Sequence, residues 1–282
     1  MKIDNHFKYI ISYKTYFFKY LTVQQFTMRI LKSPFSFFTL IHGDTMVLDR
    51  WLWLKSRLPS TLNKERLIDL GCGSGAFSIN SALRGYNVVG LSYDAKNNYK
   101  ATQRAKDFSA LNCVFYTSDL NELESFSKTK NWLNTFDICI NFENIEHMLD
   151  DKKLIKNIFD ILKPGGRLLI TAPSHICSDP GPFSITEDGG HVRRGYSKVE
   201  MMELFNLIGF ELELQDSCSG FFSQKITRIF GRLSVINSYF AWLVILPFRL
   251  LPLVFDPVIR FIFGYKDHSV CFEAIKPRLN SK

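Results

Sequence analysis

The stretch Leu67-Ile68-Asp69-Leu70-Gly71-Cys72-Gly73-Ser74-Gly75 decides how this chain is built. Its apolar start predicts a short buried strand that runs into a glycine-rich turn, and a helix is expected to begin near Ala76. Glycines at 71, 73 and 75 allow a tight turn and a close approach of the backbone to a ligand. The helix directs free N–H groups and the positive end of its dipole toward that ligand. We therefore expect a small-molecule site at this turn.

The residue types around the turn narrow the kind of ligand. Gly71, Gly73 and Ala76 satisfy a loose dinucleotide pattern, which is weak by itself and leaves a nicotinamide-dependent oxidoreductase as one alternative. Asp69 argues against it, because a carboxylate two residues before the turn repels a pyrophosphate and attracts a cation. A ligand with an ammonium and a sulfonium group suits the turn better.

Residues 68–75 resemble the first motif of the class I S-adenosylmethionine-dependent methyltransferases. Residues 136–147 resemble the fourth strand of that family and the loop after it, and Leu-Lys-Pro-Gly-Gly at 162–166 resembles the turn into the fifth strand. The resemblance extends from Asp44 to Gly220 and includes the last strand near Val270. It implies S-adenosylmethionine as the cofactor.

Strand and helix patterns alternate through the middle of the chain, as expected for βαβ units with right-handed crossovers. We predict a doubly wound α/β fold with a mainly parallel, Rossmann-like sheet of seven strands, the last antiparallel. We predict an extension over 1–42 and a methyltransferase domain over 43–282, with an apolar helical insertion at 219–267. The predicted strands are 66–70, 87–91, 113–117, 137–141, 167–172, 210–215 and 269–275. We also predict a helix over 198–208, closed by Gly209, and a helix before the first strand that ends at Pro59. The apolar face of that first helix is Val47, Leu48, Trp51, Leu52, Leu54 and Leu58.

Charge and cysteine content bear on the environment of the protein. Of the net charge of +8, residues 1–42 contribute +5 and residues 225–282 contribute +6, whereas the middle of the chain is slightly acidic. Both basic ends are rich in apolar residues, which favours an anionic membrane surface over nucleic acid as a partner. The six cysteines form no CxxC pair and no metal-ligand cluster is visible. We expect a cytoplasmic protein without a bound metal, with peripheral association at the inner face of a membrane as a further expectation.

Ligands of open parallel sheets bind beyond the carboxyl ends of the strands, and several polar residues are predicted there. The resemblance implies that Asp119 contacts the adenine and that an acidic residue after the second strand binds the ribose. Ser92 stands at that position, so Asp94 is the alternative, although Asp94 could equally cap the next helix. The expected cofactor-binding residues are Asp69, Gly71, Cys72, Gly73, Gly75, Ser92, Asp94, Asp119, Leu120 and Phe142.

Methyl transfer requires alignment of the reacting atoms and, for a hydroxyl acceptor, a base. The candidate bases are His147, His175 and His191. His147 follows the fourth strand and is our first choice, with a loop-ordering hydrogen bond as the alternative. His191, Arg193 and Tyr196 lie in a polar stretch expected over the substrate, where a network that orders the loop is also open.

The insertion contains an uncharged run from Leu233 to Phe248, followed by prolines at 252 and 257. This run is too short for a spanning helix, which needs about 20 residues, and we expect a helical hairpin or an interfacial segment. A packed apolar subdomain or an oligomer interface is the alternative.

Together these features predict a methyltransferase that acts on a small or lipid-linked acceptor, such as a glycolipid or polysaccharide precursor or a quinone-like compound. A catalytically silent, membrane-associated protein that binds S-adenosylmethionine is one alternative, and a nucleic-acid methyltransferase is another. The loop after the fourth strand reads Asn141-Phe142-Glu143-Asn144 and has no Pro-Pro pair, which argues against methylation of a nucleic-acid base.

Overall fold

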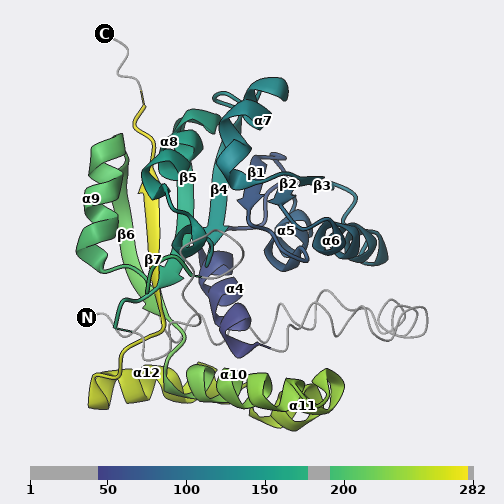
Figure 1. Cartoon of the computed structure of the whole chain (residues 1–282), viewed down its shortest axis with the longest axis vertical. Helices are drawn as coiled ribbons and strands as arrows, with labels where there is room; N and C mark the ends of the chain where they lie inside the picture. The colour runs from purple at the N-terminus through teal and green to yellow at the C-terminus, as the bar shows by residue number, and fades with distance from the viewer. Residues whose placement is uncertain (1–43, 177–190, 279–282) are drawn as a thin grey trace. The chain divides into compact units, whose positions relative to one another are not determined.

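The computed structural model describes residues 44–176 and 191–278, and their arrangement is drawn in Figure 1. A seven-stranded sheet with the order β3-β2-β1-β4-β5-β7-β6 forms the centre. Its strands are β1 Arg66–Leu70, β2 Asn87–Ser92, β3 Cys113–Thr117, β4 Phe136–Phe142, β5 Leu162–Pro173, β6 Glu211–Cys218 and β7 Ser269–Ile275.

The strand directions confirm the predicted fold class. The pairs β1–β2, β1–β4, β2–β3 and β4–β5 are parallel. β7 is antiparallel to both of its neighbours, β5 and β6. Because β5 and β6 are each antiparallel to β7, they point in the same direction, and the carboxyl end of β6 lies at the same edge of the sheet as those of the parallel strands.

Helices cover both faces of the sheet. The chain moves outward from β1 in one direction through β2 and in the other through β4, so right-handed crossovers place the two sets of helices on opposite faces. Accordingly, α5 contacts α6, whereas α8 contacts α7 and α9. These helices are α5 Ala76–Ala82, α6 Ala95–Asp107, α7 Leu123–Thr129, α8 Asp151–Ile161 and α9 Lys198–Ile208, with short 3₁₀ turns η1 Leu120–Glu122 and η2 Ile145–His147.

The largest buried cluster lies between the sheet and the α8–α9 side, where aromatic rings meet edge to face. Phe205 of α9 packs against Phe272 of β7 with ring centroids 5.7 Å apart, and Phe159 of α8 packs against Phe210 at 5.0 Å. Burying such side chains is the main favourable term in folding. This core holds α8 and α9 against β6 and β7.

β5 begins earlier than the sequence predicted. Arg167 was expected as its first residue, with Pro164-Gly165-Gly166 as a separate reversal, but the strand starts at Leu162. Leu162 already pairs with Phe136, and the end of β7 satisfies the backbone of the turn: Gly165 N donates to Lys276 O at 2.7 Å, and Lys276 N donates to Gly166 O at 2.9 Å. Long-range pairing thus extends the strand through a turn that local sequence alone would isolate.

Helix α4 (Thr45–Arg57) precedes β1 as expected, but the side it buries is not purely apolar. The sequence predicted a face of Val47, Leu48, Trp51, Leu52, Leu54 and Leu58. The structure buries Leu54 and Leu58 as predicted, but also the polar Thr45 and Arg50. Arg50 can be buried because it bonds to Glu143, in the loop after β4, and to Ser269, the first residue of β7.

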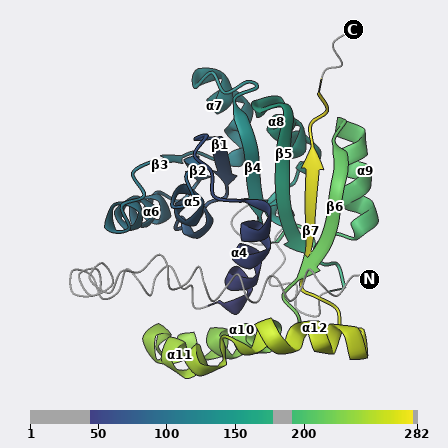
Figure 2. The ribbon, with the colours of Figure 1, turned by 180° about the vertical axis from the view of Figure 1, so that it is seen from behind.

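The insertion between β6 and β7 forms three helices, α10 Phe221–Ser234, α11 Ser238–Ile245 and α12 Leu251–Phe263, with a 3₁₀ turn η3 Leu246–Phe248. They lie in one row beyond the edge of the sheet where β5 and β6 end, in the views of Figures 1 and 2 alike. In the described part of the chain, no single helix is both long and apolar enough to cross a membrane. The segments Ser238–Phe248 and Leu251–Phe263 pass that test only as a pair, bent by 62°. The predicted extension over 1–42 lies outside the described residues.

Candidate functional site

The glycine turn after β1 adopts the backbone that its sequence predicted. Gly71, Gly73 and Gly75 have φ values of +81°, +50° and +82°, in the left-handed region that favours glycine. Gly71 N and Cys72 N both donate to Leu91 O, at 2.9 and 3.0 Å, which holds the turn against the end of β2. A Cβ added at Gly73 would meet no atom within 4 Å. The described backbone therefore leaves room beside Gly73 for a ligand, as a cofactor cradle requires.

Asp69 has a structural partner that the sequence did not reveal. Its buried carboxylate accepts a hydrogen bond from the Ser78 hydroxyl at 2.5 Å and so fastens the first turn of α5 to β1. Burial raises the pKa of this carboxyl to about 6, while the bond from Ser78 acts in the opposite direction. The role in attracting a cationic ligand stays a prediction.

Ser92 and Asp94 lie at the carboxyl end of β2. Ser92 is the last residue of the strand and is buried, and its hydroxyl accepts from Asp94 N at 3.3 Å. Asp94 is the N-cap of α6 and accepts from Lys96 N at 2.8 Å, the capping role that the sequence had left open. Neither residue is thereby prevented from contacting a ribose.

Beyond β3, Asp119 and Leu120 divide into an exposed and a buried residue. Asp119 is exposed and accepts from Asn121 N at 2.9 Å, whereas Leu120 packs in the core. An exposed carboxylate at the end of this strand is where the family resemblance expects the adenine contact.

Phe142 and Cys72 supply buried, uncharged surface near the turn. The Phe142 ring packs edge to face on Phe77 of α5 at 4.9 Å and against Trp53 of α4 at 5.8 Å. Burial raises the pKa of the Cys72 thiol well above its ordinary value, so the thiol is neutral at neutral pH.

The loop after β4 is held directly against the glycine turn. Asn141 Nδ2 donates to Leu70 O at 3.1 Å and to Asn144 Oδ1 at 3.2 Å. A Cβ at Gly71 would come within 2.6 Å of Asn144 Nδ2, so glycine is required there for the two loops to touch. Side chains on η2, which follows Asn144, therefore lie next to the cofactor turn.

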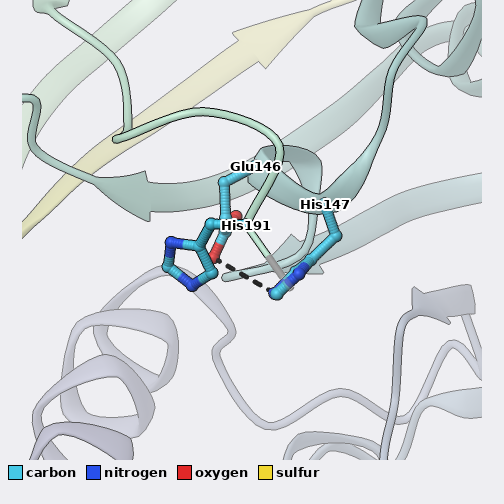
Figure 3. Close-up of side chains that lie close together, drawn as sticks. All are labelled: Glu146, His147 and His191. Atoms are coloured by element: carbon cyan, nitrogen blue, oxygen red, sulfur yellow. Dashed lines mark ion pairs between the residues drawn. The ribbon is translucent and has the colours of Figure 1, made fainter. Parts of the chain in front are cut away.

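Two histidines and a glutamate converge at η2 (Figure 3). The rings of His147 and His191 meet edge to face with centroids 4.8 Å apart, and His147 Nε2 lies 3.8 Å from Glu146 Oε1. Val192 N donates to Glu146 O at 3.0 Å, which fixes the strand-like segment that carries His191. The sequence placed His147 and His191 on the substrate side separately, and the structure brings them together.

Burial favours the neutral forms of Glu146 and His191. Glu146 is buried, and burial together with the nearby Glu143 raises its pKa well above the ordinary value. Burial first, and then the proximity of His147, lowers the pKa of His191. Within the described residues, Glu146 Oε2 and His191 Nδ1 are buried without a hydrogen-bond partner. Buried polar atoms of this kind are commonly matched by a ligand or by water.

The ligand atoms of Glu146, His147 and His191 lie within 4.8 Å of one another, so these residues could hold a metal ion. A tetrahedral zinc site would need shorter separations, because Zn–N bonds are about 2.0–2.1 Å long. The sequence-based expectation of no metal stays a prediction.

A second cluster beside the first was not predicted. Arg50 of α4 donates to Glu143 Oε2 at 2.8 Å and, through Nη2 and Nε, to Ser269 Oγ at 3.2 and 3.3 Å. His268 Nε2 lies 3.9 Å from the same Glu143 oxygen. Glu143 has a φ of +47°, which is unusual for a residue other than glycine and is typical of functional sites. The available signal was the charged pair Asp49-Arg50 within the otherwise apolar residues 46–54.

Arg193 and Tyr196 were expected at the substrate, and the structure directs both toward Asp151. Arg193 Nη1 donates to Asp151 Oδ2 at 2.7 Å, and the Tyr196 hydroxyl donates to the same oxygen at 3.0 Å. The guanidinium also stacks over the Tyr196 ring at 5.1 Å. Because Tyr196 is buried, the pair forms the loop-ordering network that the sequence had left as the alternative.

Comparison with known proteins decides the family. The methyltransferase domain family matches residues 62–205, about half of the chain. The chain belongs to the class I S-adenosylmethionine-dependent methyltransferases. The match covers the glycine turn, the loop after β4 and most of α9 of this methyltransferase, and it confirms the family predicted from the sequence.

Individual relatives are more distant. A mitochondrial ubiquinone biosynthesis O-methyltransferase from Bos taurus is 30% identical over 113 residues, which cover 39% of this chain and 29% of that protein. A protein named putative methyltransferase YqeM from Bacillus subtilis is 30% identical over 131 residues, 45% of this chain and 49% of that protein. The alignments thus span less than half of these curated relatives.

Solved structures share the fold at low identity. The [4+2]-cyclase SpnF superimposes with a TM-score of 0.55 at 17% identity, over 80% of each chain. A phosphoethanolamine N-methyltransferase from Haemonchus contortus in complex with S-adenosylmethionine gives 0.56 at 19% identity, over 81% of this chain and 52% of that one. These likenesses support the fold, whereas the family match supports the methyltransferase assignment.

Proposed function

We propose that this chain transfers a methyl group from S-adenosylmethionine to a hydroxyl group of a small, quinone-like acceptor, free or lipid-linked. The observation that carries the proposal is the position of His147, which sits on η2 directly after the loop that contacts the glycine turn. The ubiquinone O-methyltransferases among the relatives favour a hydroxyl of a quinone precursor as the acceptor.

The residues at the turn fit the cofactor. Gly73 leaves open space, Phe142 offers a buried aromatic ring, and Asp119 offers an exposed carboxylate for the adenine amino group. When bound, S-adenosylmethionine supplies an electrophilic methyl group. The chain's own residues then have to orient the acceptor, exclude water and remove the hydroxyl proton.

His147 is proposed as the general base for that proton. Its ring is about one-third exposed, whereas Glu146 beside it is buried. The edge-to-face contact with His191 restricts the ring orientation, which favours proton transfer at a fixed position. His191 acts in this scheme as a positioning residue.

The test is methyl transfer to a panel of hydroxylated aromatic acceptors, with and without a prenyl chain. We expect His147→Gln to lower kcat about 100-fold, as for loss of a general base, with an unchanged dissociation constant for S-adenosylmethionine. His175→Gln is the matched control, because His175 is exposed and its backbone N donates to Tyr196 O at 3.3 Å, and we expect an unchanged kcat. Equal kcat values for His147→Gln and wild type would exclude the base role.

A chelator distinguishes the base from a metal at the same residues. Activity that is unchanged by EDTA supports His147 as the base, and activity that EDTA removes and a divalent cation restores would reassign Glu146, His147 and His191 as ligands.

The second candidate function is a catalytically silent protein that binds S-adenosylmethionine. Ser92 favours it, because a neutral residue stands where the family commonly has an acid. Cofactor binding without transfer to any acceptor in lipid and sugar extracts would support this alternative.

A further inference from the structure

The three helices of the insertion, here called the outer layer (Phe221–Phe263), expose an unusual amount of apolar side chain. Large apolar residues that are exposed elsewhere in the described chain are scattered, and singly exposed residues of that kind need no explanation. In the outer layer sixteen of them fall within residues 229–263, and a concentration of that kind marks an interaction site. The exposed residues are Ile229, Val235, Ile236, Tyr239, Phe240, Leu243, Leu246, Phe248, Leu250, Leu253, Val254, Phe255, Val258, Phe261, Ile262 and Phe263.

Polar contacts on the inner side fix which way the layer faces. The Thr227 hydroxyl donates to Asp44 at 2.6 Å, and the Ser223 hydroxyl donates to Asp49 of α4. Asp256 of α12 accepts from Phe222 N at 2.7 Å and from Ser223 N, and so caps the start of α10. Since the polar groups are used inward, the apolar side chains are left facing outward.

The charge of the outer layer indicates which kind of partner can bind to it. Residues 221–266 carry six Lys/Arg and a single acid, Asp256, which is buried. Of the six, Arg249 is also buried and Arg260 pairs with Asp267 at 2.7 Å, whereas Lys225, Arg232 and Lys266 are exposed. The outward charge is therefore positive. A second copy of this surface would bring like charges together, whereas an anionic bilayer complements both the charge and the apolar side chains.

The helices are too short to span a bilayer singly. The eight residues of α11 extend about 12 Å and the 13 of α12 about 20 Å, against a hydrocarbon thickness of about 30 Å. In addition, α10 contacts α4, α11 and α12, which keeps the row against the domain. The layer is thus suited to lie in the plane of the interface.

The layer also lies on the side of the domain where methyl transfer would occur. The first helix of the layer follows the carboxyl end of β6. Strand β6 ends at the same edge of the sheet as β1, β4 and β5. Helix α4, which contacts α10, carries the Arg50 that bonds to Glu143 in the loop after β4. A bilayer against the layer would therefore face the edge of the sheet that holds the site.

We propose that the outer layer is a monotopic docking surface for an anionic lipid bilayer. The proposal goes beyond the proposed function and does not depend on the identity of the acceptor. It requires that the outward apolar side chains enter the interface while Lys225 and Arg232, which are exposed, contact lipid headgroups.

The test is cosedimentation of the full chain with vesicles of phosphatidylcholine alone or of an equal mixture of phosphatidylcholine and phosphatidylglycerol. We expect binding to the anionic vesicles, weakened by salt. The double variant Phe261→Ser with Phe263→Ser should lower the partition coefficient about tenfold or more, because two exposed aromatic side chains are lost from the interface. The matched control is Leu62→Ser with Leu111→Ser, since those leucines are 97% and 82% exposed outside the layer, compared with 90% for Phe261 and 75% for Phe263.

Two double variants that remove positive charges isolate the electrostatic contribution to vesicle binding. Lys225→Gln with Arg232→Gln should remove the preference for anionic vesicles, whereas Lys152→Gln with Lys198→Gln, which are exposed on α8 and α9, should leave it unchanged. Circular dichroism checks that each variant is folded.

Three results would overturn the proposal. The first is no binding to either vesicle type, as expected if another part of the chain covers the layer. The second is equal vesicle binding by wild type and the Phe261→Ser/Phe263→Ser variant. The third is a dimer, measured by light scattering, that this variant dissociates without any change in vesicle binding, which would make a second copy the occupant.

Discussion

The sheet and the outer layer differ in where their large aromatic side chains lie. In the sheet, Phe272 and its neighbours are fully buried, and the charged residues of α8 face outward. In the outer layer, Asp256 is buried and Phe261 is exposed. The two regions thus differ in how they place large aromatic side chains, and the docking proposal rests on that difference.

The largest expected effect is at the glycine turn, on the sheet side of the comparison. Gly73→Arg should abolish binding of S-adenosylmethionine, because the new side chain fills the open space beside the turn at a φ of +50°. Calorimetry measures the loss. Gly264→Arg is the matched control, since Gly264 has a φ of +60° and equally open surroundings but ends α12. Wild-type affinity in Gly73→Arg would mean that the cofactor does not occupy this turn.

The next effect compares one phenylalanine from each region. Phe272→Ala should lower the free energy of unfolding by about 3–5 kcal/mol, because it leaves a cavity in the core. Phe261→Ala should change it by less than about 0.5 kcal/mol, since the side chain is already exposed. Urea unfolding in the absence of lipid measures both. Similar losses in the two variants would show that Phe261 is covered within the protein.

A smaller, pH-dependent effect is expected where the two regions meet. Burial raises the pKa of the Asp49 carboxyl from 3.8 to about 7, the Ser223 hydroxyl opposes this shift and Asp256 adds to it. Between those values the folded chain holds a proton that the unfolded chain has released, so this group makes stability fall as pH rises from about 4 to about 7.

Asp49→Asn removes that contribution while it keeps an acceptor for Ser223. We expect the variant to gain stability relative to wild type as pH rises through this window, by an amount on the order of 4 kcal/mol. Urea unfolding at a series of pH values measures the difference. Asp69→Asn is the comparison in the sheet. Its difference in stability from wild type should change at lower pH, up to the Asp69 pKa of about 6. A constant difference across pH would show that Asp49 is ionised in the folded protein.

Local sequence patterns were sufficient for the sheet and the cofactor turn. The bounds of α9 and β7 agree with the predicted 198–208 and 269–275, because a Ser cap, a terminal Gly and an apolar run are signals within a few residues. Contacts between residues far apart in the sequence could not be predicted from such local signals. The cluster of Arg50, Glu143 and Ser269 joins three distant segments, and the early start of β5 depends on hydrogen bonds to Lys276.

The sequence by itself determined the strand–turn–helix of the cofactor site, since Gly71, Gly73 and Gly75 adopt positive φ values that glycine takes without steric cost. Only the tertiary structure decided the partners of the charged residues. Arg193 bonds to Asp151, Asp69 to Ser78, and Asp256 to the start of α10. The physical reason is that a turn is set by local backbone sterics, whereas a buried charge must find whichever polar group the fold brings within hydrogen-bonding distance.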